Sequence, residues 1–170
     1  MGRWGGRLIE SVQGSGKIRL VKGVTRNPAA HQELAAKSGI ALTESYDEVL
    51  RDPQIDAVVL ATPHSQHFEQ IVQAAKAGKH VYVEKPMTLR LPQAIRLLKV
   101  TNENPSVRVN VGTQYVMTPS YNEARKLIDA GAIGKATFSQ TSYCRNSKDG
   151  EWLYYEIDPA WQPGVNLDWN

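Results

Sequence analysis

The chain of 170 residues lacks the sequence features that are typical of several protein classes. Its single cysteine, Cys144, excludes an internal disulfide framework and is consistent with a reducing compartment. No run approaches the eighteen apolar residues of a transmembrane helix, and Glu10 interrupts any secretory signal after the basic start. The 20 basic residues are dispersed and exceed the acidic ones by only three. We therefore expect a cytoplasmic protein that binds neither membrane nor nucleic acid.

What is present is an alternation of apolar runs with helical patterns. Such an alternation is typical of a parallel sheet with right-handed crossovers, so the predicted fold class is α/β, with a Rossmann-type doubly wound sheet. The expected strands lie at 18–24, 55–61, 80–83 and 107–111, and the expected helices at 28–37, 67–77 and 91–101.

Two of these helices show an apolar stripe at the spacing i, i+3, i+4, i+7, which we expect to face the sheet. Gly78 follows the first helix as its expected C′ residue. The two stripes are Phe68, Ile71, Val72 and Ala75, and Leu91, Ala94, Ile95 and Leu98.

The pattern of expected elements changes after Gln114. Thr118 and Pro119 predict the start of a helix that runs through Ile128 and is closed by Gly131, and a strand is expected at 135–143. A long irregular stretch follows from Asn146. We therefore divide the chain into a dinucleotide-binding domain, 1–114, and the beginning of an α/β substrate domain, 115–170.

The most informative stretch is 81–86, an apolar run that ends in an acid, an amine and an imino acid. Ligands of open α/β sheets gather where the strands end, which places Lys85 at a reaction site. Proline after lysine implies a sharp turn, and X-Pro is the bond that readily becomes cis. Taken alone, the same residues also fit a surface pair of Glu84 and Lys85 at a strand exit.

The N-terminus matches the last four positions of the phosphate-binding motif G-x-G-x-x-G. Here Gly2, Trp4 and Gly5 would bring backbone N–H groups to a pyrophosphate at a helix start. The first half of the motif is absent, so a frayed N-terminus is the alternative.

The end of the second strand of such a fold discriminates between the two nicotinamide cofactors. An acid there binds a ribose 2′-OH, whereas a basic residue favours a 2′-phosphate. This chain has Thr25, Arg26 and Asn27 at that position and no carboxylate, which favours NADP over NAD. The alternative is that Arg26 is a solvated turn residue.

A further strand ends in Thr62, Pro63 and His64, with His67 one turn into the next helix. Thr62 could hydrogen-bond a ribose or phosphate, and Pro63 could wall the nicotinamide. Either histidine alone is more often a cap or a surface residue.

These motifs together closely resemble the Gfo/Idh/MocA family of NAD(P)-dependent oxidoreductases. The residues that carry the resemblance are 62–64, His67, the string A-G-K-H-V-x-x-E-K-P at 77–86, and Gly112, Thr113 and Gln114. The resemblance implies an enzyme that moves a hydride between the cofactor and a sugar or inositol, in a homo-oligomer without a metal.

The resemblance also implies roles for individual residues. Lys85 would contact the substrate and the nicotinamide ribose. A lysine amine is protonated at neutral pH, so Lys85 is better cast as a hydrogen-bond donor that stabilises a developing alkoxide than as a base. From position alone, Tyr115 follows the Gln114 exit and could face the substrate, although an aromatic residue there more often serves packing. Tyr143, Arg145 and Asn146 end the later strand and could border the pocket. The expected cofactor-binding residues are Gly2, Trp4, Gly5, Thr25, Arg26, Thr62, Pro63, His64, His67, Glu84, Lys85, Pro86 and Gln114.

Two parts of the family pattern are absent: the first strand with its glycine, and most of the second domain. The first strand is central in the order 3-2-1-4-5-6, so the strands around Val21 and Val58 should lack a shared neighbour. We therefore expect an inactive fragment of a dehydrogenase. The alternatives are a non-catalytic nucleotide-binding or assembly module, and a reductase of a non-sugar carbonyl or imine.

Overall fold

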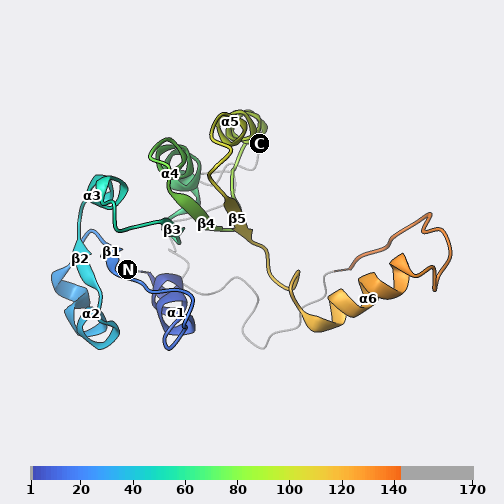
Figure 1. The fold of residues 1–170 in the computed structure, drawn as a ribbon, viewed down its shortest axis with the longest axis horizontal. Helices are drawn as coiled ribbons and strands as arrows, with labels where there is room; N and C mark the ends of the chain where they lie inside the picture. Colours follow the sequence, from blue (N-terminus) through green and yellow to red (C-terminus); the bar gives the residue numbers. More distant parts are fainter. Residues whose placement is uncertain (1, 143–170) are drawn as a thin grey trace, which may run out of the picture. The chain divides into compact units, whose positions relative to one another are not determined.

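A computed structural model of the chain describes residues 2–142, and these form the helices and strands shown in Figure 1. Tyr143, Arg145 and Asn146 lie outside the described residues. The chain divides into two compact units, Met1–Thr118 and Pro119–Asn170. The elements in chain order are α1 (Arg3–Ser11), β1 (Lys22–Val24), the 3-10 helix η1 (Ala29–His31), α2 (Gln32–Ser38), β2 (Ala41–Thr43), α3 (Tyr46–Arg51), β3 (Ala57–Leu60), α4 (His64–Lys76), β4 (His80–Glu84), α5 (Leu91–Glu103), β5 (Val109–Gly112) and α6 (Pro119–Asp129).

The strands of the first unit form two parallel sheets. One has the order β1-β2 and the other the order β3-β4-β5. In chain order these match the two halves of a doubly wound sheet on either side of its central strand. Within residues 2–142, β1 pairs only with β2 and β3 pairs only with β4. The expectation that these two strands lack a shared neighbour is confirmed for the described residues.

The main core lies between the three-stranded sheet and the helices α4 and α5, which cover the same face of it (Figure 1). The predicted stripe of α4 is confirmed, since Phe68, Ile71, Val72 and Ala75 are all at most 6% exposed. Val58, Val81 and Val83 face this stripe from the strands. Gly78 ends α4 with a φ of 73°, the left-handed conformation expected of a C′ residue.

The predicted stripe of α5 is wrong. Leu91, Ile95 and Leu98 are 72%, 61% and 62% exposed, whereas Leu97 and Val100 are buried. Apolar residues at helical spacing lie on more than one side of α5. The spacing alone therefore does not identify which side is buried. Leu97 and Val100 also sit at i and i+3, and they are the pair that packs on the sheet.

The α1–α2–β2 region has a small core of its own. Ile9 of α1 packs with Ala35 of α2 and with Ile40, which precedes β2. α1 therefore rests on the α2–β2 segment through one buried isoleucine. A helix of nine residues is marginal by itself and depends on such a contact.

Two elements between 39 and 54, β2 and α3, escaped the sequence analysis. β2 has only three residues, too few for an alternation to be visible. α3 carries a signal that was available: Ser45 caps the helix by accepting a hydrogen bond from the Glu48 backbone N–H at 3.3 Å. Tyr46 then links α3 to α4 through its hydroxyl, which donates to the Gln70 carbonyl, and burial raises the pKa of this tyrosine.

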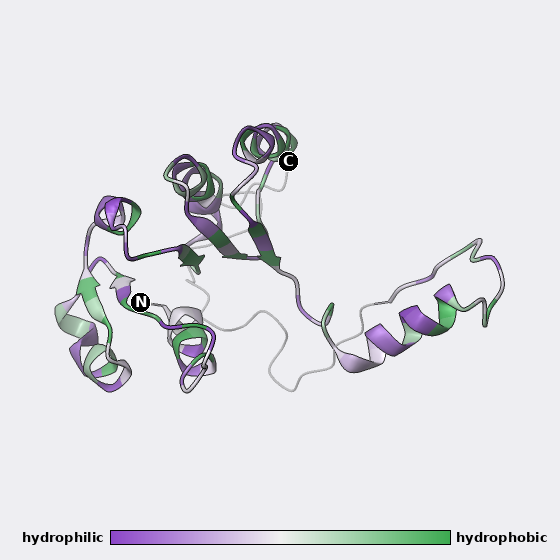
Figure 2. Cartoon of the chain, in the orientation of Figure 1, coloured by the Kyte–Doolittle hydropathy of each residue, from purple (hydrophilic) through white to green (hydrophobic). Residues whose placement is uncertain are grey.

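The second unit contains α6, which begins at Pro119 and is followed by Gly131 at a φ of 82°, as the sequence predicts. Figure 2 shows hydrophilic residues along much of this helix. The strand expected at 135–143 does not form over 135–142. A strand is stabilised by pairing, and the sheets of the described residues include no partner for this segment. No helix in the described ranges is long and apolar enough to cross a membrane.

Two lysines hold the segment between α3 and β3 in place. The buried Lys79 donates from its Nζ atom to the carbonyls of Asp52 and Ile55, both at 2.7 Å. Lys22 of β1 forms an ion pair with the Asp52 carboxylate at 2.9 Å. This hydrogen bond, with a second from the Gln54 backbone, lowers the pKa of Asp52. The contacts join both sheets to one turn, although the strands themselves do not pair.

We expect Lys79→Met to lower the free energy of unfolding by about 1 to 3 kcal/mol, because the buried Ile55 carbonyl and the part-buried Asp52 carbonyl lose their donor. Denaturant unfolding monitored by circular dichroism measures the change. Lys76→Met is the matched control, since Lys76 is exposed at the end of α4 and should change little. Equal effects of the two substitutions would contradict the anchoring role.

Candidate cofactor site at the strand ends

The ends of β3, β4 and β5 meet at one edge of the sheet. Leu60 pairs with Val83, and Glu84 pairs with Gly112. Continuing this register places Thr62, Lys85 and Thr113 at the same level. The strand exits that the sequence analysis singled out are therefore neighbours across the sheet.

Lys85 stands at the centre of this edge. Its side chain is exposed, and among residues 2–142 no hydrogen bond or ion pair engages its amine. The Lys85–Pro86 peptide bond is cis, as the sequence allowed. The amine is thus available to a ligand at the strand edge.

His67 connects the exits of β3 and β4 from within the protein. Its ring is fully buried, with Nδ1 2.8 Å from the Pro86 carbonyl oxygen and Nε2 2.9 Å from the Thr62 carbonyl oxygen. Both ring nitrogens are therefore used inside the fold, and the ring presents no polar atom to a ligand. Among the described residues that the sequence predicted for the site, His67 is buried beneath the strand exits and contacts their backbone.

The residues around His67 present different groups to the edge. The Thr62 hydroxyl donates to the Gln70 side-chain oxygen at 2.5 Å, so its lone pairs stay available as acceptors. Pro63 and His64 are exposed at the start of α4. The His64 ring meets the His67 ring edge-on, with centroids 5.6 Å apart.

The start of α1 has the features of an anion site. Gly2 is the N-cap residue in an extended conformation, no side chain caps the helix, and its first turn has no acidic residue. The first N–H groups of a helix lack intrahelical partners and carry the positive end of its dipole. Gly5 lies in this turn, and the half-exposed Trp4 stacks with the Arg7 guanidinium, 5.5 Å from the ring centroid. The backbone here can bind a phosphate.

Three residues that follow β1, Thr25, Arg26 and Asn27, have different environments. Thr25 is buried, and its backbone N–H donates to the Thr43 carbonyl. Asn27 accepts the Ala30 backbone N–H through Oδ1 at 3.2 Å and so caps the following turn. Arg26 is exposed and carries the positive charge of this exit.

A close contact between β4 and β5 was not anticipated from the sequence. Tyr82 and Glu84 share one face of β4, as residues two apart in a strand do. A Cβ atom at Gly112 would lie 2.5 Å from the Tyr82 hydroxyl oxygen and 3.1 Å from Glu84 Oε1. Desolvation, with the charge of Glu84, raises the pKa of Tyr82. Gly112 leaves room for two polar side chains just before the Lys85 exit.

The exit of β5 is open to solvent. Gln114 and Tyr115 are exposed, and Tyr115 has a φ of 68°, which is unusual for an aromatic residue. The sequence predicts Gln114 beside the cofactor and Tyr115 beside the substrate. Both follow directly from the strand edge that carries Lys85.

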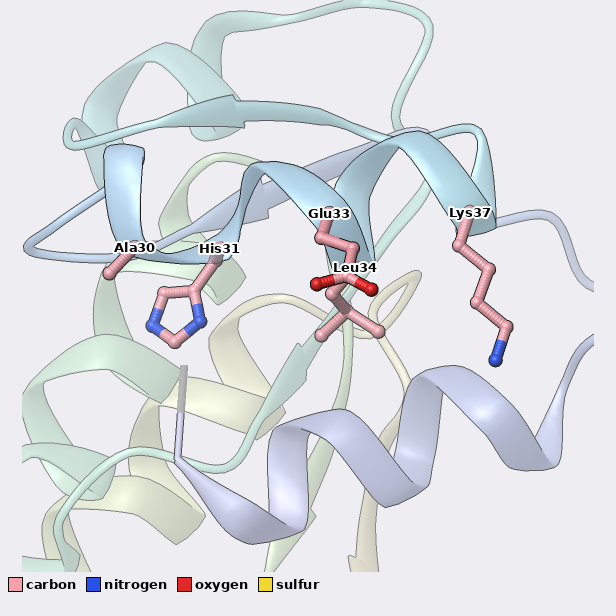
Figure 3. Close-up of a pocket in the computed structure, with 5 residues that line it drawn as sticks. All are labelled: Ala30, His31, Glu33, Leu34 and Lys37. Atoms are coloured by element: carbon pink, nitrogen blue, oxygen red, sulfur yellow. The ribbon is translucent and has the colours of Figure 1, made fainter.

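Two hollows in the described residues lie away from these side chains. One, shown in Figure 3, has a volume of about 270 Å³ and is lined by Ala30, His31, Glu33, Leu34 and Lys37, which all belong to the η1–α2 segment. Figure 3 shows His31, Leu34 and Lys37 pointing from this segment toward α1. No group of three or more His, Cys, Asp or Glu residues within 2–142 could hold a metal ion.

Comparison with protein families identifies the fold that surrounds this edge. The model of the oxidoreductase family with an NAD-binding Rossmann fold, GFO_IDH_MocA, matches residues 1–113. These residues include the strand exits and the start of α1.

Individual relatives are dehydrogenases of polyols and sugars. The chain is 40% identical over 132 residues to a scyllo-inositol 2-dehydrogenase (NAD(+)) of Bacillus subtilis, which covers 77% of this chain and 37% of that protein. It is 35% identical to a D-xylose 1-dehydrogenase (NADP(+)) of Hypocrea jecorina, over 73% of this chain and 33% of the relative. The chain thus spans little more than a third of the length of these curated relatives.

Solved structures agree with this assignment. A scyllo-inositol dehydrogenase from Lactobacillus casei, solved with NAD(H) and scyllo-inositol, superposes with a TM-score of 0.67 at 27% identity, covering 79% of this chain and 40% of that one. A myo-inositol 2-dehydrogenase from Lactobacillus plantarum superposes with a TM-score of 0.70 at the same identity and coverage. The Rossmann fold predicted from the sequence is confirmed.

We expect Gly112→Ala to destabilise the protein by about 1 to 3 kcal/mol, because the new methyl group displaces the Tyr82 ring. Combining it with Tyr82→Phe should recover part of the loss, since the closest atom is the tyrosine oxygen. Thermal unfolding of the single and double variants measures this coupling.

Gly6→Ala is the control for this experiment. Gly6 lies inside α1 in open space, where an added methyl group would meet no neighbouring atom, so alanine there should stabilise by about 0.5 to 1 kcal/mol. A Gly112→Ala variant as stable as Gly6→Ala would contradict the contact.

Proposed function

The chain belongs to the Gfo/Idh/MocA family of oxidoreductases, and from that premise we propose that it supplies the nicotinamide-binding part of a sugar or inositol dehydrogenase. The observation that carries the proposal is the exposed Lys85 at the strand edge, level with Thr62 and Thr113. The uncapped start of α1 supports it, because the backbone there suits a pyrophosphate.

In the proposed reaction, a carbon that bears a hydroxyl loses a hydride and its oxygen loses a proton. The nicotinamide supplies the hydride acceptor when it is bound. The Lys85 ammonium donates a hydrogen bond to the substrate oxygen and stabilises the negative charge that develops as the proton leaves. A separate base must take that proton, since an ammonium has no free lone pair. Lys85 thus orients the substrate and stabilises the transition state.

The other strand exits form the cofactor contacts of the proposal. The Thr62 hydroxyl can accept a hydrogen bond, and Pro63 and His64 offer an exposed wall at the start of α4. Glu84 and Pro86 flank Lys85, and Gln114 stands on the neighbouring exit. Tyr115 extends the same edge toward the substrate.

For the cofactor itself, we favour NADP over NAD. Arg26 is exposed after β1, whereas Asn27 is occupied as a cap and no carboxylate follows the strand. A guanidinium is well suited to a 2′-phosphate. The named relatives include enzymes of both kinds, one described with NAD(+) and one with NADP(+).

A second candidate is reduction of a ketone on a nucleotide-linked sugar. A relative from Streptomyces violaceoruber, 31% identical over 79% of this chain and 39% of its own length, is named dTDP-3,4-didehydro-2,6-dideoxy-alpha-D-glucose 3-reductase. The same Lys85 amine would then donate to the ketone oxygen as it gains negative charge. Turnover assays in both directions with inositols, aldoses and ketosugars separate the two candidates.

We expect Lys85→Ala to lower kcat about 10²- to 10³-fold, as removal of a single oxyanion donor does in other enzymes, while the cofactor dissociation constant changes less. The assay follows nicotinamide absorbance with a panel of sugars and inositols. Lys99→Ala is the control, because Lys99 is exposed on α5 and pairs with Glu103. Unchanged turnover in Lys85→Ala would leave a nucleotide-binding module as the better description.

For Arg26→Ala we expect NADPH affinity to fall about 10- to 100-fold, with little change for NADH, because a charge-assisted hydrogen bond contributes about 1.5 to 3 kcal/mol. Fluorescence titration of the 170-residue chain with each cofactor measures both constants. Arg51→Ala controls for loss of charge, since Arg51 is exposed on α3 and pairs with Asp47. A wild-type chain that binds NADH more tightly than NADPH would contradict the cofactor preference.

A further inference from the structure

A short hydrogen bond between Thr62 and Gln70 joins the exit of β3 to the second turn of α4. The Thr62 Oγ1 atom lies 2.5 Å from the Gln70 Oε1 atom. An O–H···O hydrogen bond spans about 2.5 to 3.0 Å, whereas an N–H···O bond begins at about 2.7 Å. The group of Gln70 that faces Thr62 is therefore its oxygen and not its amide nitrogen.

Two further contacts hold Gln70 in this orientation. Its Nε2 atom donates to Gln66 Oε1 at 3.4 Å, one turn earlier on α4. The Tyr46 hydroxyl of α3 donates to the Gln70 backbone carbonyl at 3.1 Å. Gln70 itself is half-buried. Because both ends of the amide and the backbone carbonyl are engaged, the oxygen of Gln70 is fixed against Thr62.

The direction of this bond decides what the Thr62 hydroxyl can offer to a ligand. An amide oxygen only accepts, so the hydroxyl must supply the proton. A hydroxyl has one proton and two lone pairs, and here the proton is used inside the protein. Thr62, which is half-buried at the strand exit, therefore meets a ligand as an acceptor. A group that binds there must donate a hydrogen bond.

This requirement distinguishes two kinds of ligand group. The oxygens of a pyrophosphate are negatively charged acceptors, so they would face a lone pair of Thr62. A ribose or polyol hydroxyl can donate its proton instead. The uncapped start of α1 and the exposed Arg26 present N–H donors, which suit phosphates. The chain therefore offers donors at those two places and an acceptor at the exit of β3.

We propose that Gln70 is a specificity-determining residue: by taking the Thr62 proton, it makes the exit of β3 select a ligand hydroxyl, on a ribose or a polyol, over a phosphate oxygen. The class of ligand rests on the proposed function. The polarity of the Thr62 hydroxyl rests on the hydrogen bond to Gln70 alone. Since Gln70 acts through Thr62, it is a positioning residue and not a catalytic one.

The first test observes the Thr62 hydroxyl proton by NMR in the ligand-free chain of 170 residues. A proton held between two oxygens at 2.5 Å should exchange slowly with water, and its signal should vanish in Thr62→Val. Gln70→Leu should release the proton, whereas Gln70→Glu keeps an acceptor oxygen and should retain it. The hydroxyl of the exposed Ser65 gives the reference rate. A Thr62 hydroxyl that exchanges as fast as that of Ser65 would overturn the proposal.

Gln73→Leu is the matched control for this measurement. Gln73 is exposed one turn further along α4, so the same change of side chain there should leave the Thr62 proton as it is. Equal loss of the signal in Gln70→Leu and Gln73→Leu would mean that the helix as a whole, and not the Gln70 oxygen, holds the hydroxyl.

The second test measures which ligand group needs Thr62. Fluorescence titration compares NADH with analogues that lack the 2′- or the 3′-hydroxyl of the nicotinamide ribose, and then titrates myo-inositol into the NADH complex. One of these hydroxyls should raise affinity about fivefold in the wild type and not at all in Thr62→Val, because a neutral hydrogen bond contributes about that much. An effect on NADH assigns the hydroxyl to the ribose, and an effect on myo-inositol alone assigns it to the polyol.

Pyrophosphate, titrated as a competitor of NADH, provides the opposite arm. It should bind the wild type and Thr62→Val equally, because Thr62 has no proton to give it. Weaker binding of pyrophosphate by Thr62→Val, or an unchanged affinity for every hydroxyl ligand, would contradict the selection.

The role of Gln70 is read from the ratio of the NADH and deoxy-analogue affinities, in which the charge of a new carboxylate cancels. Gln70→Glu should keep the wild-type ratio. Gln70→Leu should lose most of it, because the Thr62 proton is then free to turn toward the ligand. A full ratio in Gln70→Leu would show that Gln70 does not set the preference.

Failure of the proposed function has a different signature. If the chain binds neither NADH nor NADPH, the proposed function fails and the selection of a ligand hydroxyl fails with it, while the NMR test still decides the polarity of Thr62. If the cofactors bind but the ratio does not depend on Gln70, the proposed function stands and the inference about Gln70 is wrong.

Discussion

Burial of one face of α4 against the three-stranded sheet is the constraint on which the rest of this structure depends. Ile71, Val72 and Ala75 are at most 3% exposed, and burial of each larger aliphatic side chain contributes about 1.5 to 3 kcal/mol. This packing sets both the rotation of α4 and its height along the strands. It thereby decides that the first turn of α4 lies at the sheet edge, with His67 directed inward and His64 outward.

The candidate site is a consequence of that packing and of parallel topology. Parallel strands end at the same edge, so residues far apart in sequence, such as Thr62, Lys85 and Gln114, come together without any local motif linking them. His67 belongs to the hydrophobic face of α4 by position, yet it spans the two exits through its ring. α4 thus contributes both the apolar residues that pack on the sheet and the histidine ring that lies between the two strand exits.

The sheet itself is divided. β1 and β2 connect to the other three strands through the Lys22 and Lys79 contacts around Asp52, and through Val21 and Val49, which pack in the main core. The three-stranded half has the larger buried core. We therefore regard the β3–β4–β5 half with α4 and α5 as the more stable part of the first unit. Lys85 directly follows the middle strand of this half.

Sequence reasoning succeeded for α4 and failed for α5, although both have clear periodicity. In α4 a single apolar stripe was available, whereas in α5 two apolar sets compete and the fold buries Leu97 and Val100. The short β2 lay below the length at which a pattern can be read, while the cap of α3 at Ser45 was a usable signal. The strand expected after Lys135 had the right alternation but has no partner among the described residues.

The sequence by itself determined the class of fold, the order of its main elements and the identity of the residues at the strand exits. Periodicity and the E-K-P exit are local properties, so they can be read without coordinates. Only the tertiary structure decided which face of α5 is buried, that Gly112 makes room for Tyr82, and that His67 faces two carbonyls. Those outcomes depend on distances between segments that lie tens of residues apart, and no local pattern encodes them.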